Sequence, residues 1–395
     1  MDFELSEEQR MMKASARKLM DQEVTPYLDS FPYGYILNKE EVVQLLKMLR
    51  PMNFLGATLP EEVGGGGLDF MDYALMMEEL DYRIFGLIMI TAGSAGMVMA
   101  AGTEDQKERL FQPLLEGEMI GCHGISEPNV GSNTGAIETR AVLDGDHYVL
   151  NGTKMWITNG SYADVATVLA NEDPSKGSKG LSRFFVEKAT CPFEARPISI
   201  MGDGPIQHVG ELIFEDCRIP KENKFGFGSA GGGSERASME GLKQTLIAFQ
   251  GARCFVGMNS LIIAQKAYEH ALQYAKERTQ FGKPIGQFQL IQAMIADMKA
   301  LIDASRLLIY RGVSLVQKGV RCAEETSMAK FYATEAAVKV ASMAVQIHGA
   351  YGLSTEYPVE HLFRHARVLT IPDGTTQIQK LIVAREVLGG LSALS

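Results

Sequence analysis

The 395-residue sequence lacks several features that would place it at once in a class of proteins. It has no excess of basic residues: its net charge is −10, whereas a nucleic-acid surface needs clustered Lys and Arg. It has no CxxC pair and no cysteine spacing typical of zinc, which excludes the common zinc modules. Its first twelve residues are acidic and lack the apolar core of a signal peptide, so we expect a cytoplasmic protein.

The cysteines are few and dispersed. There are five, an odd number, and this pattern predicts reduced thiols in a cytosolic protein. They are Cys122, Cys191, Cys217, Cys254 and Cys322. Hydrophobic residues make up 46% of the chain and charged residues 22%, the balance of an ordinary globular protein whose length allows two or three domains.

Long apolar runs are also scarce. Only residues 84–103, twenty residues without a charge, are long enough to be considered as a membrane span. This stretch contains four glycines and is flanked by acidic segments. We therefore interpret it as a buried pair of helices and predict no membrane span.

The patterns that are present divide the chain into three parts. Residues 1–119 repeat apolar positions at helical spacing and predict an all-α domain. Residues 120–228 contain short alternating segments between turn residues and predict a small antiparallel β-barrel or sandwich. Residues 229–395 predict a four-helix bundle, so the expected fold class is α+β. The four helices are expected at 242–277, 287–318, 322–349 and 376–388.

Two short patterns match known motifs without the context that those motifs need. Residues 226–231 fit GxGxxG, but no βαβ unit surrounds them, so we interpret them as an interdomain connection. His361 and His365 are four residues apart, as metal ligands on a helix can be, but no third ligand accompanies them. We predict no metal site.

Five segments carry a more specific signal. They are residues 124–132 (GISEPNVGS), 151–160 (NGTKMWITNG), 277–283 (ERTQFGK), 346–352 (QIHGAYG) and 371–379 (IPDGTTQIQ). Together, in this order and at these intervals, they resemble the acyl-CoA dehydrogenase family over essentially the whole chain. The resemblance implies a helical, a β and a four-helix-bundle domain, FAD as cofactor and an acyl-CoA substrate. It also implies an electron-transferring flavoprotein as partner and a homotetramer, or at least a dimer.

The resemblance also implies which residues hold FAD. The segment around Ser126 would meet the pyrimidine edge of the flavin, and Trp156 and Thr158 would meet its ring, where a flat indole shields the reactive face from water. Arg278 would reach the diphosphate across a subunit interface. Ala350 departs from the family pattern, which usually has a second glycine there. The implied FAD contacts are His123, Ile125, Ser126, Trp156, Thr158, Arg278, Gln280, Phe281, Gln346, Gly349, Thr375 and Gln377.

For the substrate, the resemblance implies contacts from Ser132, Arg253 and Gly374. It assigns the catalytic base to Asp373, at the position where most members have a glutamate whose arm is longer by about 1.5 Å. The other base position known in the family is occupied by Ala252, which cannot accept a proton. Asp373 would remove the α-proton while hydride leaves the β-carbon for flavin N5, and burial should raise its pKa.

Two features of the sequence bear on the identity of the acyl group. Residues 83–93 correspond to the helix that lines the acyl pocket in this family, and past Arg83 they are wholly apolar. This favours a hydrocarbon acyl group, with Arg83 in a surface salt bridge. The short Asp373 favours a bulky α-carbon, with cyclohexanecarboxyl-CoA as the narrowest hypothesis. Alternatives are an enoyl-CoA reductase, an acyl-CoA oxidase or flavin monooxygenase of the same fold, and a non-catalytic protein that binds FAD and acyl-CoA.

Overall fold

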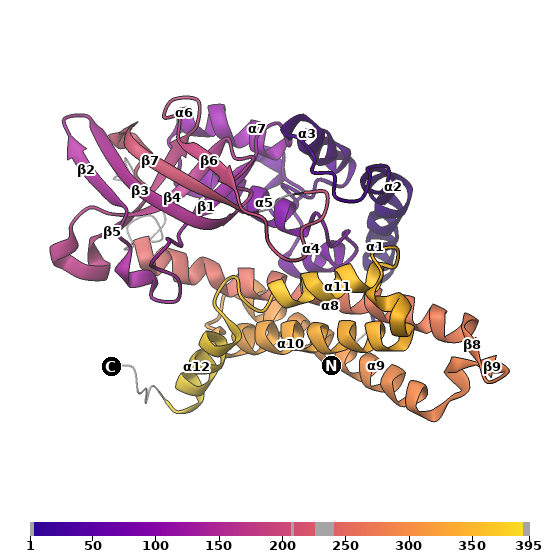
Figure 1. Ribbon diagram of the computed structural model, residues 1–395. Helices are drawn as coiled ribbons and strands as arrows, with labels where there is room; N and C mark the ends of the chain where they lie inside the picture. Colours follow the sequence, from indigo (N-terminus) through magenta and orange to yellow (C-terminus); the bar gives the residue numbers. More distant parts are fainter. Residues whose placement is uncertain (1–3, 207–208, 226–240, 390–395) are drawn as a thin grey trace. The chain divides into compact units, whose positions relative to one another are not determined.

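The computed structural model describes residues 4–206, 209–225 and 241–389. The chain divides into two compact units, and each combines stretches that lie far apart in the sequence (Figure 1). Unit 1 contains Met1–Arg17, Asp69–Tyr82 and Phe249–Ser395, and unit 2 contains Lys18–Leu68 and Arg83–Ala248. The GxGxxG pattern at 226–231 lies outside the described residues.

Unit 1 is built from helices that pack on one another. Helix α10 packs against α9, α11 and α12, and α9 also packs against α4. Ala329, Ala333 and Ala337 on α10 are buried, and their small side chains let the neighbouring helices approach closely. The helices of this unit are α1 (Glu7–Leu19, which ends in unit 2), α4 (Phe70–Met77), α8 (Gly241–Glu277, which begins in unit 2), α9 (Gln289–Gln317), α10 (Ala323–His348), α11 (Pro358–Val368) and α12 (Thr376–Val387). The short strands β8 (Thr279–Gln280) and β9 (Lys283–Pro284) form a hairpin between α8 and α9.

The structure confirms the four helices predicted beyond residue 241 and adds α11. Helix α11 is 11 residues long, and Pro358 occupies its first turn, where proline is tolerated. Its buried residues Val359, Leu362 and Ala366 recur at helical spacing. The periodic signal is therefore present but short, and it lies between two loop-like motifs that obscure it.

Unit 2 contains the apolar helix α5 (Phe85–Ala101), which corrects the expectation of a helix pair at 84–103. It is one continuous helix of 17 residues, and Gly93 and Gly96 do not break it. Packing explains this continuity, because tertiary contacts supply most of the stability of helices in proteins. Among the described residues, no helix is long and apolar enough to cross a membrane. The other α-helices of unit 2 are α2 (Thr25–Asp29), α3 (Lys39–Met48), α6 (Glu104–Gln106) and α7 (Gln112–Leu115).

The β part of unit 2 is one seven-stranded sheet with the order β1-β4-β2-β3-β7-β6, and β5 pairs with β4. Strands β1 and β2 run parallel to β4, so the sheet is mixed, whereas the sequence predicted an antiparallel arrangement. Leu150, Val168, Phe184 and Leu212 belong to its buried core. The strands are β1 (Gly121–Gly124), β2 (Arg140–Asp144), β3 (His147–Thr158), β4 (Val165–Asn171), β5 (Leu181–Glu187), β6 (Glu194–Pro197) and β7 (Val209–Pro220).

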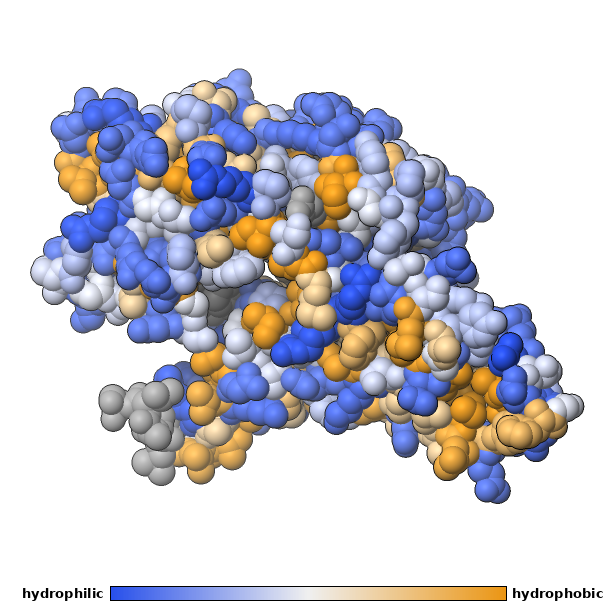
Figure 2. Space-filling model, viewed as in Figure 1, coloured by the Kyte–Doolittle hydropathy of each residue, from blue (hydrophilic) through white to orange (hydrophobic). Residues whose placement is uncertain are grey.

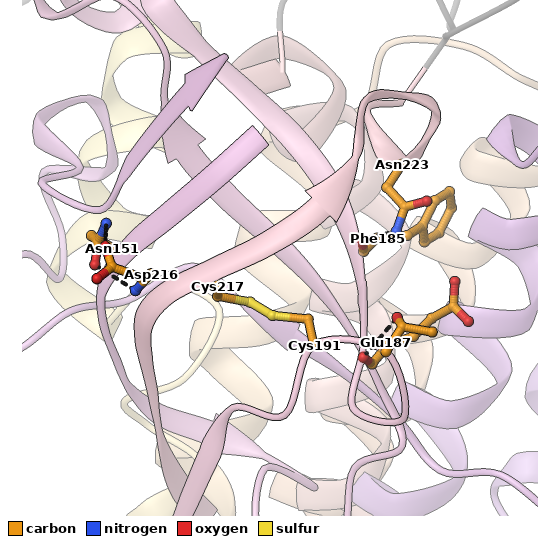
Figure 3. Close-up of a disulfide and its surroundings, with 8 residues drawn as sticks. Asn151, Phe185, Glu187, Cys191, Asp216, Cys217 and Asn223 are labelled. Atoms are coloured by element: carbon orange, nitrogen blue, oxygen red, sulfur yellow. Dashed lines mark hydrogen bonds between the residues drawn. A yellow bond between two sulfur atoms is a disulfide. The ribbon is translucent and has the colours of Figure 1, made fainter. Parts of the chain in front are cut away.

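Two cysteines correct the expectation that all thiols are reduced. Cys191, in the segment after β5, forms a disulfide with Cys217 on β7, and their Cα atoms are 5.7 Å apart (Figure 3). The backbone N–H of Cys191 also donates to the carbonyl of Glu187 at 2.9 Å. The pairing follows from the topology of the sheet, which brings together residues 26 positions apart, and the cysteine spacing alone gives no sign of it.

A buried ion pair joins the loop after β1 to strand β3. Lys154 Nζ donates to Glu127 Oε1 at 2.7 Å and to the carbonyl of Ile125 at 3.1 Å. Glu127 also accepts the backbone N–H groups of Glu138 at 2.7 Å and Thr139 at 2.9 Å. Both charged side chains are buried, so each depends on the other for compensation. Lys154 thereby fixes the loop that carries Ile125 and Ser126.

We expect Lys154→Met to destabilise the protein by about 3–5 kcal/mol, because it leaves the Glu127 carboxylate buried without its cation. Trp156, the only tryptophan, lies on the same strand and reports unfolding in a urea titration. Arg218→Met, which removes an exposed pair with Asp144, is the matched control and should cost less than about 1 kcal/mol. Equal costs for the two variants would contradict the structural role of Lys154.

Candidate active site

Asp373 lies in a tight turn between α11 and α12. Asp373 and Gly374 have positive φ values of 53° and 90°. A Cβ on Gly374 would come within 2.6 Å of Gln379 Nε2, so the position favours glycine. A positive φ is uncommon for a residue such as Asp373 and is often found at functional sites. The surrounding packing must hold this turn in place.

Two buried side chains hold it. Lys330, on α10, is fully buried, and its Nζ donates to the carbonyls of Gly374 at 2.9 Å and Thr370 at 3.2 Å. Gln379, on α12, donates through Nε2 to the carbonyls of Asp373 at 2.8 Å and Gly374 at 3.1 Å. These four hydrogen bonds give side-chain donors to the carbonyls of Thr370, Asp373 and Gly374, and the carbonyl of Thr370 also accepts the N–H of Thr376 at 3.1 Å.

The charges around Asp373 act on its pKa in opposite directions. Burial raises the pKa of the Asp373 carboxyl above its ordinary value, and the nearby Lys330 and Arg253 oppose that rise. Burial also lowers the pKa of Lys330 to about 8, against the attraction of Asp373 and Glu335. The expected direction of the Asp373 shift is therefore confirmed. A carboxylate with a raised pKa is better matched to accepting a proton near neutral pH.

Arg253, on α8, has the same surroundings. Its side chain is 6% exposed, and its Nε has no hydrogen-bond partner within the described parts of the chain. A buried guanidinium nitrogen without an acceptor fits a site that takes an anionic or carbonyl group. This observation fits the substrate contact implied for Arg253. Gly374, the other implied contact in unit 1, is half-buried in the turn itself.

Lys330 and Gln379 are residues of this site that the sequence analysis missed. A signal for Lys330 exists, because it is a lone lysine among Ala329, Ala333 and Ala337 on the buried face of α10. A charged residue on an otherwise apolar helix face is seldom buried without a purpose. No comparable signal marks Gln379.

The implied flavin-ring residues come together in unit 2. Met155 N–H donates to the carbonyl of Ser126 at 2.9 Å, which places the loop of Ile125 and Ser126 beside strand β3 with Trp156 and Thr158. Trp156 has a φ of 63° and is 54% exposed, so it is not a core tryptophan. A large flat ring left open next to backbone polar groups fits a flat aromatic cofactor such as a flavin. His123 is on β1, and Ser132 is exposed in the following loop.

The remaining implied FAD contacts lie in unit 1, in two places. One place is the β8–β9 hairpin, which carries Arg278, Gln280 and Phe281. The Arg278 guanidinium lies 5.4 Å from the centre of the Tyr351 ring, and Tyr351 follows the end of α10, where Gln346 and Gly349 are found. Thr375 and Gln377 begin α12, where Thr375 Oγ1 accepts the N–H of Ile378.

These two places are far apart along α8. From Arg253, near Asp373, to the last residue of α8 the helix rises by about 36 Å, at 1.5 Å per residue. The structure of unit 1 therefore does not bring the Arg278 group and Asp373 together.

Two other expectations concern His361, considered above as a possible metal ligand, and Arg83. His361 Nδ1 lies 2.7 Å from the Tyr82 hydroxyl. The described residues contain no group of three or more His, Cys, Asp or Glu side chains that could hold a metal ion. Arg83 Nη1 pairs with Asp29 Oδ1 at 2.6 Å, as expected for a salt bridge at the helix start.

Comparisons with known proteins identify the family of the chain. Residues 6–118 match the N-terminal domain of acyl-CoA dehydrogenase, residues 122–217 its middle domain and residues 239–388 its C-terminal domain. A short-chain specific acyl-CoA dehydrogenase of Clostridium acetobutylicum is 34% identical over 98% of this chain and 100% of its own length.

Two further relatives cover the chain to a similar extent. The CarC subunit of the caffeyl-CoA reductase–Etf complex of Acetobacterium woodii is 34% identical over 97% of this chain and 99% of its own. The solved structure of butyryl-CoA dehydrogenase from Megasphaera elsdenii has a TM-score of 0.87 and 34% identity, and covers 98% of this chain and 100% of its own. Three domain models match the chain in order, and these relatives align with it over nearly their whole length. The chain therefore belongs to the acyl-CoA dehydrogenase family of FAD-dependent oxidoreductases.

Proposed function

We propose that the protein removes hydrogen from the α- and β-carbons of an acyl-CoA thioester, with Asp373 as the base. The observation that carries the proposal is the turn at Asp373, which Lys330 and Gln379 hold in a left-handed conformation next to the partly unsatisfied Arg253. A non-catalytic binding protein would have no need to keep a half-buried acid in this conformation.

Each residue has a separate part in the chemistry. Bound FAD supplies the acceptor for the β-hydride. The Asp373 carboxylate accepts the α-proton, and its raised pKa makes it a stronger base than an exposed aspartate. Lys330 positions the turn through two carbonyls, and Arg253 takes an oxygen-bearing group of the substrate. Trp156 covers the cofactor ring and keeps water from it.

For the acyl group we propose an apolar chain or ring, with cyclohexanecarboxyl-CoA as the narrowest candidate. Support comes from the short side chain of Asp373 and from the apolar sequence of α5. The relatives named above are called short-chain, butyryl-CoA and caffeyl-CoA enzymes, so none of these names supports a cyclohexane ring. The reverse reaction, reduction of an enoyl-CoA, is the second candidate because one of them is a reductase by name.

We also propose an electron-transferring flavoprotein as redox partner and a homotetramer as the assembly. The name of the CarC relative supports the partner, since it belongs to a complex with Etf. The separation of about 36 Å along α8 supports the assembly, because it leaves the Arg278 group free to serve the FAD of a neighbouring copy. Hydrophobic residues gather around the β8–β9 hairpin (Figure 2), where Phe281 is 93% exposed.

The first prediction concerns Asp373. Asp373→Asn should keep FAD and bind acyl-CoA but reduce the flavin about 10²–10⁴-fold more slowly, because the amide cannot accept the α-proton. Stopped-flow absorbance without oxygen measures this rate. Asp373→Glu is the matched control: it keeps the acid and lengthens its arm, so it should favour straight-chain over cyclic substrates. An unchanged rate in Asp373→Asn would show that another acid, such as Asp81, is the base.

The second prediction concerns Lys330. The base works only when ionised, so the rate should fall as the pH drops through the raised pKa of Asp373. Lys330 lowers that pKa, so Lys330→Met should raise it further and move the acidic limb of the pH–rate profile to higher pH. Lys330→Arg keeps the charge and should move the limb less. A Met variant with full FAD content and an unshifted limb would contradict this role.

The third prediction concerns assembly. Light scattering of the FAD-loaded protein should give a tetramer, or at least a dimer. Arg278→Ala should weaken FAD retention, because a bidentate donor to phosphate is lost. Arg311→Ala, which changes another exposed arginine of unit 1, should leave FAD content unchanged. A stable monomer that holds FAD with full affinity would rule out the shared site.

A further inference from the structure

Strand β5 carries a buried arginine, Arg183, that has no anionic partner among the described residues. Arg183 is 5% exposed, and burial alone lowers the pKa of its guanidinium to about 10. Its contacts are a hydrogen bond from Nη1 to the sulfur of Met97 at 3.4 Å and the ring of Phe225, 5.9 Å from the guanidinium carbon. Within the described parts of the chain, no carboxylate pairs with it. The nearest acid along the strand, Glu187, is already paired with Arg109.

The position of Arg183 on the strand explains which side it faces. Phe184 and Val186 belong to the core of the sheet, whereas Phe185 packs in the cluster with Ala95 and Val98 of α5. Side chains alternate along a strand, so Arg183 lies on the same side as Phe185, toward α5. Its contact with Met97 agrees with this placement.

Arg183 contacts the half-buried face of α5. Gly86, Ile90, Gly93 and Met97 are half-buried and recur at spacings of three and four residues, so they share one side of the helix. This is the helix assigned above to the acyl pocket. Arg183 therefore adds a positive charge at the Met97 end of an otherwise apolar face.

A second polar group lies on the same face. A Cβ at Gly93 would come within 3.2 Å of His123 Cε1, so the imidazole sits directly against the helix there. Ser94 Oγ donates to the carbonyl of Ile90 at 2.9 Å, which leaves its oxygen to accept from His123 Nε2–H at 3.2 Å. Burial, and next the charge of Arg183, lower the pKa of His123 to about 3, so the ring is neutral. The positive charge of this region comes from Arg183.

We infer that Arg183 is the centre of a binding site for an anionic oxygen group of the acyl-CoA ligand. A buried cation is costly unless it is paired, and the fork of a guanidinium suits a carboxylate or a phosphate. The group is either a carboxylate at the end of the acyl chain or a phosphate of CoA. The inference rests on the proposed function for its ligand, and on the unpaired Arg183 for its site.

The first test needs no acyl-CoA. Arg183→Met replaces an unpaired buried charge by an apolar side chain of similar length, so the ligand-free holoenzyme should melt at the same or a higher temperature. A Met variant that melts lower, or fails to fold, would show that the fold itself needs the guanidinium and would overturn the inference. This test remains valid even if the proposed function fails.

The second test measures binding anaerobically through the flavin absorbance, in the Asp373→Asn background to prevent turnover. The ligands are glutaryl-CoA, butyryl-CoA and CoA. A lost charge-assisted contact should weaken binding about 10–100-fold. A loss confined to glutaryl-CoA assigns the site to an acyl carboxylate, and an equal loss for all three assigns it to CoA.

Unchanged affinity for all three ligands would overturn the inference. The control is Arg196→Met, which removes an exposed arginine paired with Glu194 in the same unit and should change neither melting nor affinity. If the unsubstituted Arg183 protein in the Asp373→Asn background bound none of the three ligands, the proposed function would fail, and the melting comparison would still decide the anion site.

Discussion

The lysine buried beneath the turn of Asp373 is the contact on which the candidate active site depends. Lys330 Nζ donates to the carbonyls of Thr370 and Gly374, which also accept the N–H of Thr376 and Gln379 Nε2, each at 3.1 Å, so the lysine adds a charged donor to both groups. Helix α12 begins directly after this turn, so the same lysine also sets where that helix starts. Lys330 therefore acts on both the position and the pKa of the acid, together with Gln379 for the position and Arg253 for the pKa.

Three of the buried cations, Lys154, Lys330 and Arg183, differ in how completely they are compensated. Lys154 has a carboxylate and a carbonyl, which is the pattern of a structural ion pair. Lys330 has two carbonyls and an acid nearby whose pKa it shifts. Among the described residues, the Arg183 guanidinium contacts a sulfur and an aromatic ring but no carboxylate. Because folding alone gives no reason to bury an uncompensated charge, the degree of compensation separates groups that serve the fold from groups that serve a ligand.

Much of the fold could be predicted because it follows from local patterns. The long helices α8, α9 and α10 repeat apolar residues over many turns, and β3, β4 and β7 have turn residues on both sides. The three-part division at 119 and 228 remains a prediction, since the compact units combine distant stretches of chain. What could not be predicted depends on topology: the parallel pairing of β1 and β2 with β4, and the disulfide between Cys191 and Cys217.

The same distinction applies to the site. Asp373 and Trp156 could be found because they lie in short motifs, whereas Lys330, Gln379 and Arg183 act from elements that carry no motif. Two of these three nevertheless break the pattern of their own element, Lys330 in an alanine-rich helix face and Arg183 next to the apolar run FFV of β5. Such a break costs stability wherever the charge is not compensated, so it persists only if selection on function maintains it. A lone charge in an apolar periodic segment is therefore a usable signal for residues that support or extend a site, even when the site itself is known from its motifs.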